Sequence, residues 1–126
     1  MSSRGVDPER LGFPAHRRLR RKSEFEAVYA RGLRLGDGFF AVTASPNGTG
    51  CARLGLAVAT KAAGSSVERN RLRRLIRESF RLRQHELPAV DLVVSARAQA
   101  RAARNDALRA SLNGLWDRVK ELSFQP

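Results

Sequence analysis

Five arginines fall between positions 69 and 77, where the chain runs Arg69-Asn70-Arg71-Leu72-Arg73-Arg74-Leu75-Ile76-Arg77. A guanidinium group binds phosphate oxygens through two parallel hydrogen bonds and stays charged at physiological pH. Like charges three or four residues apart destabilise a helix by roughly 0.2–0.5 kcal/mol per pair. That cost is offset where a polyanion lies against the arginines, so the segment predicts contact with nucleic acid.

The positive charge is concentrated rather than spread. The formal net charge is +12, and residues 17–22 carry five positive charges with no acid. Residues 69–83 add seven arginines against one glutamate, while the other 105 residues hold twelve basic and eleven acidic side chains. A solvated face is the alternative interpretation of a charge run, but such faces usually mix both signs. Two clusters in a balanced background indicate two contact surfaces.

Residues that could carry catalysis or hold a metal are sparse. His16 and His85 lie far apart, and Cys51 is the only cysteine, which excludes an internal disulfide and a cysteine cluster. We find no Ser/His/Asp set and no carboxylate pair, so we expect no catalytic residue and no metal site. The polar N-terminus and the lack of a long apolar run predict a cytoplasmic protein without a signal peptide or a membrane segment.

Hydrophobic periodicity and turn residues predict the elements that position these side chains. In chain order they are a helix at about 23–31, a short strand near 33–35, strands at 39–44 and 53–60, a helix at about 67–84, a strand at 91–96 and a helix that Asn105 or Asp106 caps. Ser23 and Glu26 have the spacing of a capping box for the first helix.

This order predicts a single α+β sandwich over residues 16–126, preceded by a flexible arm at 1–15. We expect a four-stranded sheet with helices on one face, and the strands at 53–60 and 91–96 as parallel neighbours. The arginine-rich helix buries one stripe and exposes another. Its predicted core residues are Leu72, Leu75, Ile76, Ser79 and Phe80, and its predicted outer residues are Arg73, Arg74, Arg77 and Arg81. Phe80 and Trp116 are predicted core aromatics.

Strand alternation predicts Phe39, Ala41 and Thr43 on one face of the sheet. If that face is open, unpaired bases could lie against its aromatic side chains, with Phe25 and Tyr29 at the border. Core packing of these aromatics is an equally good interpretation. A helix-turn-helix reader of DNA needs a second helix directly before the basic one. Here a strand and a loop precede it, which favours recognition of folded RNA.

The segment from Thr60 to Leu82 resembles the arginine-rich signature of the bacterial ribonuclease P protein component. Three flanking patterns also resemble that family: Arg18-Leu19 followed by Phe25 and Tyr29, then Arg53-Leu54-Gly55-Leu56-Ala57-Val58, and finally Leu87-Pro88 with Asp91-Leu92-Val93-Val94. The resemblance covers about residues 13–122.

The resemblance implies the protein subunit of a ribonucleoprotein endonuclease that removes the 5′ leader from precursor tRNA. It implies one-to-one binding to a catalytic RNA subunit, which holds the catalytic centre and its Mg²⁺, and binding to precursor tRNA. It also implies a ribosomal-protein-like fold with a left-handed crossover between the strands near Thr60 and Asp91. The general rule for such connections predicts a right-handed one.

The resemblance also implies which residues contact RNA. The family positions are Lys61, Arg69, Asn70, Arg71, Arg73, Arg74 and Arg77, and the charge clusters add Arg81, Arg17, Arg18, Arg20 and Arg21. The predicted cleft for the leader consists of Phe25, Tyr29, Phe39, Thr43, Val58 and Thr60. Thr43 stands where many relatives have an aromatic, and we expect Phe39 to compensate. Ala62 and Ser65 also depart from the family pattern and weaken the predicted phosphate contacts of the loop.

Two other classes of function stay open at this point. One is a binding module associated with the ribosome, which would bind RNA without a part in cleavage. The other is a nuclease that acts without RNA, which would need the clustered carboxylates that the sequence lacks.

Overall fold

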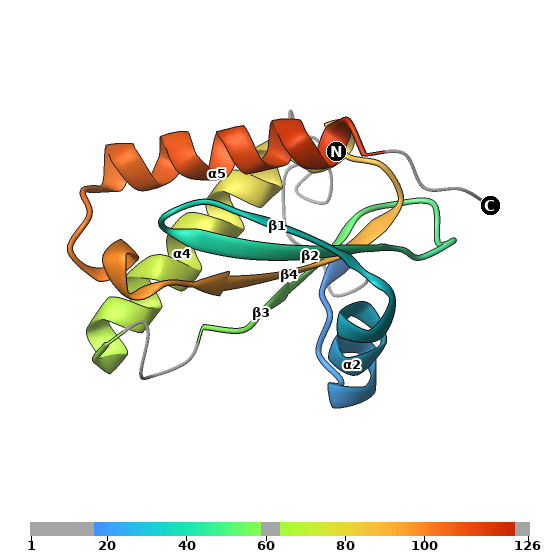
Figure 1. Cartoon of the computed structure of the whole chain (residues 1–126), viewed down its shortest axis with the longest axis horizontal. Coiled ribbons are helices and arrows are strands. Elements are labelled where there is room, and N and C mark those ends of the chain that lie inside the picture. The colour runs from blue at the N-terminus through green and yellow to red at the C-terminus, as the bar shows by residue number, and fades with distance from the viewer. Residues whose placement is uncertain (1–16, 59–63, 123–126) are drawn as a thin grey trace, which may run out of the picture.

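The structure is a computed structural model that describes residues 17–58 and 64–122 (Figure 1). The predicted arm at 1–15 and the predicted contacts Thr60 and Lys61 lie outside the described residues. Within them, the elements follow the predicted order. They are α2 (Lys22–Arg31), β1 (Leu33–Gly36), β2 (Phe40–Pro46), β3 (Arg53–Leu56), α4 (Ser66–Arg83), β4 (Val90–Ala96) and α5 (Asn105–Lys120), with short 3₁₀ turns at Gln84–Glu86 and Ala98–Arg101.

The four strands form one mixed sheet in the order β1-β2-β4-β3. The pairs β1–β2 and β2–β4 are antiparallel, whereas β3 and β4 run parallel, with Leu54 opposite Leu92. The prediction of parallel neighbours on either side of the arginine-rich helix is therefore confirmed. β3 is shorter than predicted and lies at one edge of the sheet.

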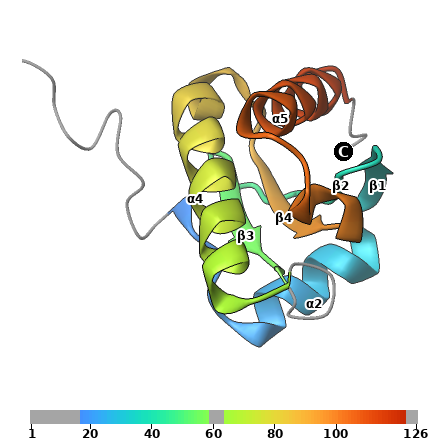
Figure 2. The ribbon, with the colours of Figure 1, turned by 90° about the vertical axis from the view of Figure 1, so that its left-hand side faces the viewer.

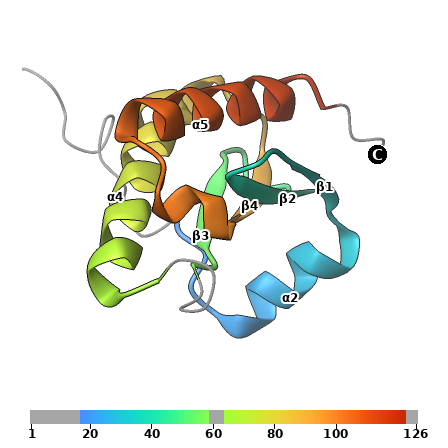
Figure 3. The same ribbon diagram turned by 60° about the vertical axis from the view of Figure 1, so that its left-hand side comes forward.

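Helices cover both faces of the sheet, so the prediction of helices on one face is wrong (Figure 3). Helices α4 and α5 pack on the face that carries Phe40, Val42 and Leu54 and form the main core with it. On the opposite face, Val28 of α2 packs against Val93 of β4 in a second, smaller cluster. Alternation along each strand buries both sets of side chains, because neither face of the central strands is left to solvent.

The main core is closed by aromatic packing between α4 and α5. Phe80 and Trp116 are fully buried, and their rings meet edge to face with centroids 6.0 Å apart. The Trp116 indole N–H donates a hydrogen bond to Ser79 Oγ at 2.7 Å, which satisfies the one polar atom of the ring. This pairing confirms the predicted core stripe of α4 and fixes the helix against α5.

The helix starts differ from the predicted ones. The capping box belongs to α4, where Ser65 Oγ accepts from the Glu68 N–H and Glu68 Oε1 accepts from the Ser65 N–H. Helix α2 instead begins after Arg21, whose N–H donates to Glu24, so the expected role of Ser23 as the cap is wrong. Neither Asn105 nor Asp106 caps α5, which follows Arg104.

Candidate nucleic-acid interface

The two basic clusters predicted from sequence meet at the β3 edge of the sheet. Arg18 pairs with Leu54 in a parallel bridge, and the Leu19 N–H donates to the Leu54 carbonyl at 2.8 Å. Residues 17–20 thus run beside β3 as a short extension of the sheet, next to α4 (Figure 2). These residues are about fifty positions from the arginine-rich helix in the sequence. They lie close to it in the fold because they pair with β3 at the edge of the sheet.

A groove of about 370 Å³ lies where these segments meet, and we call it the β3-edge groove. Its lining combines arginines on the rim with apolar side chains on the floor. The rim residues are Arg18, Arg20, Arg73 and Arg77, and the floor residues are Leu19, Phe25, Leu54 and Leu56. Four cations around an apolar floor suit a nucleic-acid strand, whose phosphates are anionic and whose bases have apolar faces.

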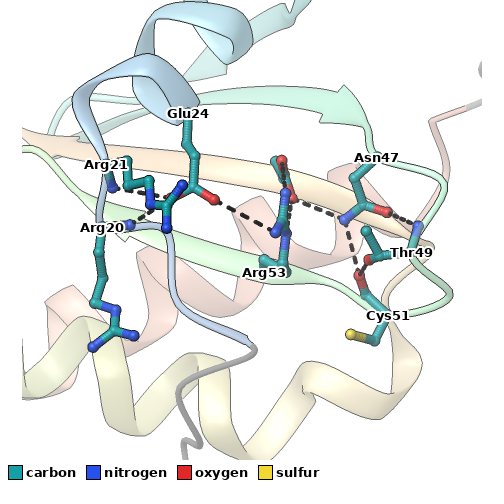
Figure 4. Close-up of polar contacts among 8 residues, drawn as sticks. Arg20, Arg21, Glu24, Asn47, Thr49, Cys51 and Arg53 are labelled. Carbon is teal, nitrogen blue, oxygen red and sulfur yellow. Dashed lines mark hydrogen bonds and ion pairs between the residues drawn. The ribbon is translucent and has the colours of Figure 1, made fainter.

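Glu24 anchors the N-terminal basic segment to this edge (Figure 4). Its Oε1 accepts hydrogen bonds from the backbone N–H groups of Arg20 and Arg21, at 3.0 and 2.9 Å. Its other oxygen lies 3.6 Å from Arg53 Nη1. The hydrogen bonds from Arg21 and Arg20 are the main reason that the pKa of Glu24 is lowered, so the carboxylate holds the segment in place while the guanidinium groups stay at the surface.

Arg53 in turn is fixed by β4. Its Nε and Nη2 donate to the two carboxylate oxygens of Asp91, each at 2.7 Å. Asn47 Nδ2 donates to Asp91 Oδ1 as well, and also to the Cys51 carbonyl, which ties the β2–β3 loop to the same network (Figure 4). The side-chain hydrogen bond to Asp91 is the main cause that raises the pKa of Arg53, so the guanidinium stays protonated in this network.

The predicted contacts on α4 divide between its two flanks. Arg73 and Arg77 line the β3-edge groove. Asn70 and Arg74 line a different groove, between α4 and α5. Arg69 is half-buried, and its Nε has no hydrogen-bond partner among the described residues; the same is true of Nη1 of Arg17.

Arg71 is a predicted RNA contact on α4 whose guanidinium is hydrogen-bonded within the protein. It donates to the carbonyls of Ala100, Arg101 and Ala103 and, at 2.6 Å, to Asn105 Oδ1. These four bonds hold the 3₁₀ turn and the start of α5 against α4. The structure therefore gives Arg71 a fold-supporting role, which charge and spacing alone did not distinguish from its neighbours.

Of the predicted cleft residues, Phe25 and Tyr29 lie on α2. Phe25 reaches the β3-edge groove and lies over Gly55, where an added Cβ would approach its ring to 2.8 Å. The glycine therefore gives the ring room to lie flat on the strand. Tyr29, one turn later, is 54% exposed.

The other described cleft residues do not share that surface. Thr43 is on the predicted face but is buried beneath Gly32 at the end of α2. Val58 belongs to the main core on the opposite face. Phe39 also packs against the main core, because the Asp37 carboxylate accepts from the N–H groups of Phe39 and Phe40 and turns the chain there, so strand alternation does not extend back to Phe39. Of the two interpretations of this face, the open aromatic platform is therefore not formed, and core packing is the one that holds for Phe39.

No three histidine, cysteine, aspartate or glutamate side chains in the described part of the chain come together to hold a metal ion. Across residues 17–58 and 64–122, no helix is long and apolar enough to cross a membrane. Sequence reasoning missed Asn105 and Arg109, which face α4 from the start of α5. Their i, i+4 spacing was visible in the sequence, but nothing there indicated which face of α5 meets the arginine-rich helix.

Comparison with known proteins agrees with this architecture. The family model described as Ribonuclease P matches residues 13–120. The ribonuclease P protein component of Escherichia coli O6:H1 is 43% identical over 117 residues, which cover 93% of this chain and 98% of that protein. The component of Chromohalobacter salexigens is 40% identical over 111 residues, which cover 87% of each.

Two solved structures extend the similarity to the fold. The RNase P protein of Staphylococcus aureus superposes with a TM-score of 0.77 at 27% identity, over 83% of this chain and 95% of that one. The RNase P protein of Thermotoga maritima superposes with a TM-score of 0.74 at 31% identity, over 81% of this chain and 96% of that one. The sequence match over nearly the whole chain and the shared sheet and helices lead to one conclusion: this chain belongs to the ribonuclease P protein family.

Proposed function

We propose that this protein binds the catalytic RNA subunit of ribonuclease P and the 5′ leader of precursor tRNA, and so assists removal of the leader. The observation that carries the proposal is the β3-edge groove. It unites the two basic clusters of the sequence around an apolar floor, next to the exposed arginine ridge of α4. A surface of this kind binds RNA through its phosphates and through unpaired bases.

The two parts of the surface suit two parts of the substrate complex. The outer ridge of α4, with Arg73 and Arg77 one turn apart, presents charge along a line and suits the backbone of a folded RNA. Phe25 in the groove and Tyr29 beside it suit the unpaired leader, whose bases can stack on aromatic rings.

In our proposal, the residues of this protein do not carry out the cleavage step. Divalent ions such as Mg²⁺ activate water and stabilise the leaving oxygen in phosphodiester hydrolysis. The described residues offer no cluster of carboxylates to hold such an ion. We therefore assign Mg²⁺ to the RNA subunit, and we assign to the protein the tasks of neutralising phosphates and orienting the leader.

Reconstitution tests this proposal. The protein, the RNA subunit and precursor tRNA are combined in all pairs and together, and release of the leader is followed over time. We expect no cleavage by the protein alone and faster cleavage by the RNA when the protein is added. Cleavage by the protein without RNA would contradict the proposal, and so would a protein that binds the RNA without changing the reaction. Native mass spectrometry of the complex should show one protein for each RNA.

A further inference from the structure

A second basic groove lies on the other flank of α4, where this helix meets the start of α5. Its volume is about 510 Å³, and we call it the α4–α5 groove. Six residues of α4 and two of α5 line it: Val67, Asn70, Arg71, Arg74, Leu75, Glu78, Asn105 and Arg109. The β3-edge groove shares none of them, so the two grooves are separate sites on one helix.

The cations of this groove are available to a ligand. Arg74 and Arg109 are exposed, one on each wall, and neither guanidinium is hydrogen-bonded or ion-paired within residues 17–58 and 64–122. Glu78 is the only acid in the lining. The local charge is therefore positive even though Arg71 is engaged in protein contacts. An anion is the complementary ligand.

The groove is also held in a fixed shape. Arg71 donates to Asn105 Oδ1 at 2.6 Å and to three carbonyls that precede α5. These bonds fix the start of α5 relative to α4. Since Oδ1 of Asn105 accepts from Arg71, its Nδ2 is left to donate into the groove. The site is thus assembled before any ligand arrives, which reduces the entropy lost on binding.

An apolar surface lies between these polar groups. Val67 is 77% exposed, and Leu75, a residue of the main core with 4% exposure, also lines the groove. A bare phosphate has no apolar group to place on this surface, and the carboxylate side chains that would pair with the arginines in an acidic peptide carry no ring. A nucleotide has both parts: its phosphate suits two arginines, its base suits the valine and leucine, and its base edge can pair with amides.

We propose that the α4–α5 groove binds one unpaired nucleotide of an RNA strand. Arg74 and Arg109 hold its phosphate, Val67 and Leu75 contact the base, and Asn70 and Asn105 meet the base edge. This inference rests on the proposed function for the identity of the RNA, which is the RNA subunit. It adds a second contact surface that lies on the far flank of α4 from the β3-edge groove.

Equilibrium binding of the full-length protein to the RNA subunit, measured over a range of salt concentrations, tests the phosphate contact. The Arg74→Ala/Arg109→Ala double variant should bind about tenfold more weakly, with a salt slope smaller by about 1.5. Arg31→Ala is the control, because it removes an exposed arginine of α2 that lines neither groove. An unchanged affinity and slope in the double variant would overturn the proposal, whether the groove is empty or takes an acidic peptide.

A second variant separates a nucleotide from a simple phosphate. Val67→Ser removes apolar surface without changing charge. Because Val67 is 77% exposed, we expect the variant to fold, and circular dichroism checks this. We expect affinity to fall about threefold with an unchanged salt slope. Full affinity in Val67→Ser would overturn the placement of a base in the groove.

Crosslinking identifies the nucleotide. A photoreactive group is attached to Val67→Cys in a Cys51→Ser background, and the crosslinked position in the RNA subunit is mapped by primer extension. One unpaired nucleotide is the expected result, and crosslinks scattered over several RNA helices would overturn the proposal. Failure of the proposed function has a different signature, because the unaltered protein would then not bind the RNA subunit at all.

Discussion

Arg53 and Asp91 face each other on the parallel strands β3 and β4 and share two hydrogen bonds of 2.7 Å. The pair is mostly shielded, with side-chain exposures of 23% and 12%. Arg53 also lies within ion-pair distance of Glu24, whose carboxylate holds the backbone of Arg20 and Arg21. A chain of contacts therefore runs from the centre of the sheet to the N-terminal basic segment at the rim of the β3-edge groove.

We predict that Asp91→Asn lowers the free energy of unfolding by about 1–3 kcal/mol, because the guanidinium of Arg53 loses its charged partner in a shielded site. Urea denaturation measures this change. The weaker anchor should also reduce affinity for the RNA subunit, although Asp91 is remote from the rim. Arg53→Lys keeps the charge but loses the two-bond geometry, and it should show the same two effects in smaller measure. Unchanged stability in both variants would contradict the role of the pair.

The α4 arginines of the β3-edge groove should contribute to binding through phosphate contacts. We expect Arg73→Ala/Arg77→Ala to weaken binding of the RNA subunit and to reduce the slope of log affinity against log salt by about 1.5 to 2. Arg83→Ala is the control on the same helix, because Arg83 is paired with Asp117 at 2.6 Å and with Glu86 at 3.1 Å. It should change stability but not the slope. Equal slopes in all three proteins would place the phosphate contacts elsewhere.

Arg71 and Arg74 are only three residues apart on α4, but substitutions at the two positions should have different effects on stability. Arg71→Ala removes four hydrogen bonds between α4 and the start of α5, so we expect the free energy of unfolding to fall by about 2–4 kcal/mol. Arg74→Ala removes an exposed side chain and should change stability by less than about 0.5 kcal/mol. Thermal or urea unfolding distinguishes the two. Similar losses in both variants would show that Arg71 is not the fold-supporting residue.

The different contacts of Arg71 and Arg74 in the structure could not be predicted from the sequence. Both belong to the same arginine-rich stretch, and their charge and spacing are alike. What separates them is the position of the 3₁₀ turn at Ala98–Arg101, because the carbonyls of Ala100 and Arg101 accept hydrogen bonds from Arg71. That turn is about thirty residues away in sequence, so periodicity within the helix carried no information about it.

Local patterns predicted the elements and their order well, because burial stripes repeat within each element. They failed where contacts with another segment determine the local structure. The motif Ser-x-x-Glu occurs at 23–26 and at 65–68, but only Ser65 caps a helix. At the first site Glu24 already accepts from the N–H groups of Arg20 and Arg21, and the helix follows Arg21, two residues before Ser23. The prediction that helices cover only one face of the sheet also failed, because strand alternation does not show where α2 packs.

The proposed contact between the exposed ring of Tyr29 and the 5′ leader of precursor tRNA can be tested by substitution. We expect Tyr29→Ala to weaken binding of precursor tRNA by the holoenzyme more than binding of mature tRNA, by about fivefold or more, because a stacked base contributes about 1–3 kcal/mol. Its effect on stability should be small, since the side chain is 54% exposed. Equal losses for both RNAs would argue against a leader contact.

Phe25→Ala and Gly55→Ala complete that comparison. Phe25 packs against the second cluster and over Gly55, so its removal should lower stability by about 1–3 kcal/mol as well as leader binding. Gly55→Ala keeps the ring but displaces it, because the new Cβ would lie 2.8 Å from the Phe25 Cζ. Loss of leader preference in Gly55→Ala would show that the position of the ring matters, and an unaltered preference would show that the ring serves only the core.

Acid should destabilise the fold through Asp37, which joins the β1–β2 turn to α5. Burial alone would raise the pKa of Asp37, but hydrogen bonds from Ser111 and from the N–H groups of Phe40 and Phe39 outweigh it, and the pKa falls below the usual 3.8. Because the folded pKa is below the unfolded one, the stabilisation is complete above about pH 5 and is lost as pH falls through the folded pKa. We therefore expect the free energy of unfolding, measured in urea at several pH values, to decline below about pH 4.5.

Asp37→Asn should be less stable than the unaltered protein at pH 7 and should lose less on acidification, so that the two stability curves approach each other at low pH. Ser111→Ala is the matched variant, because it removes one of the bonds that lower the pKa of Asp37 and leaves the carboxylate in place. Its curve should lie between the other two. Glu24, whose pKa is also lowered, keeps some acid dependence in every variant. Parallel curves for the unaltered protein and Asp37→Asn would show that Asp37 does not carry the acid sensitivity.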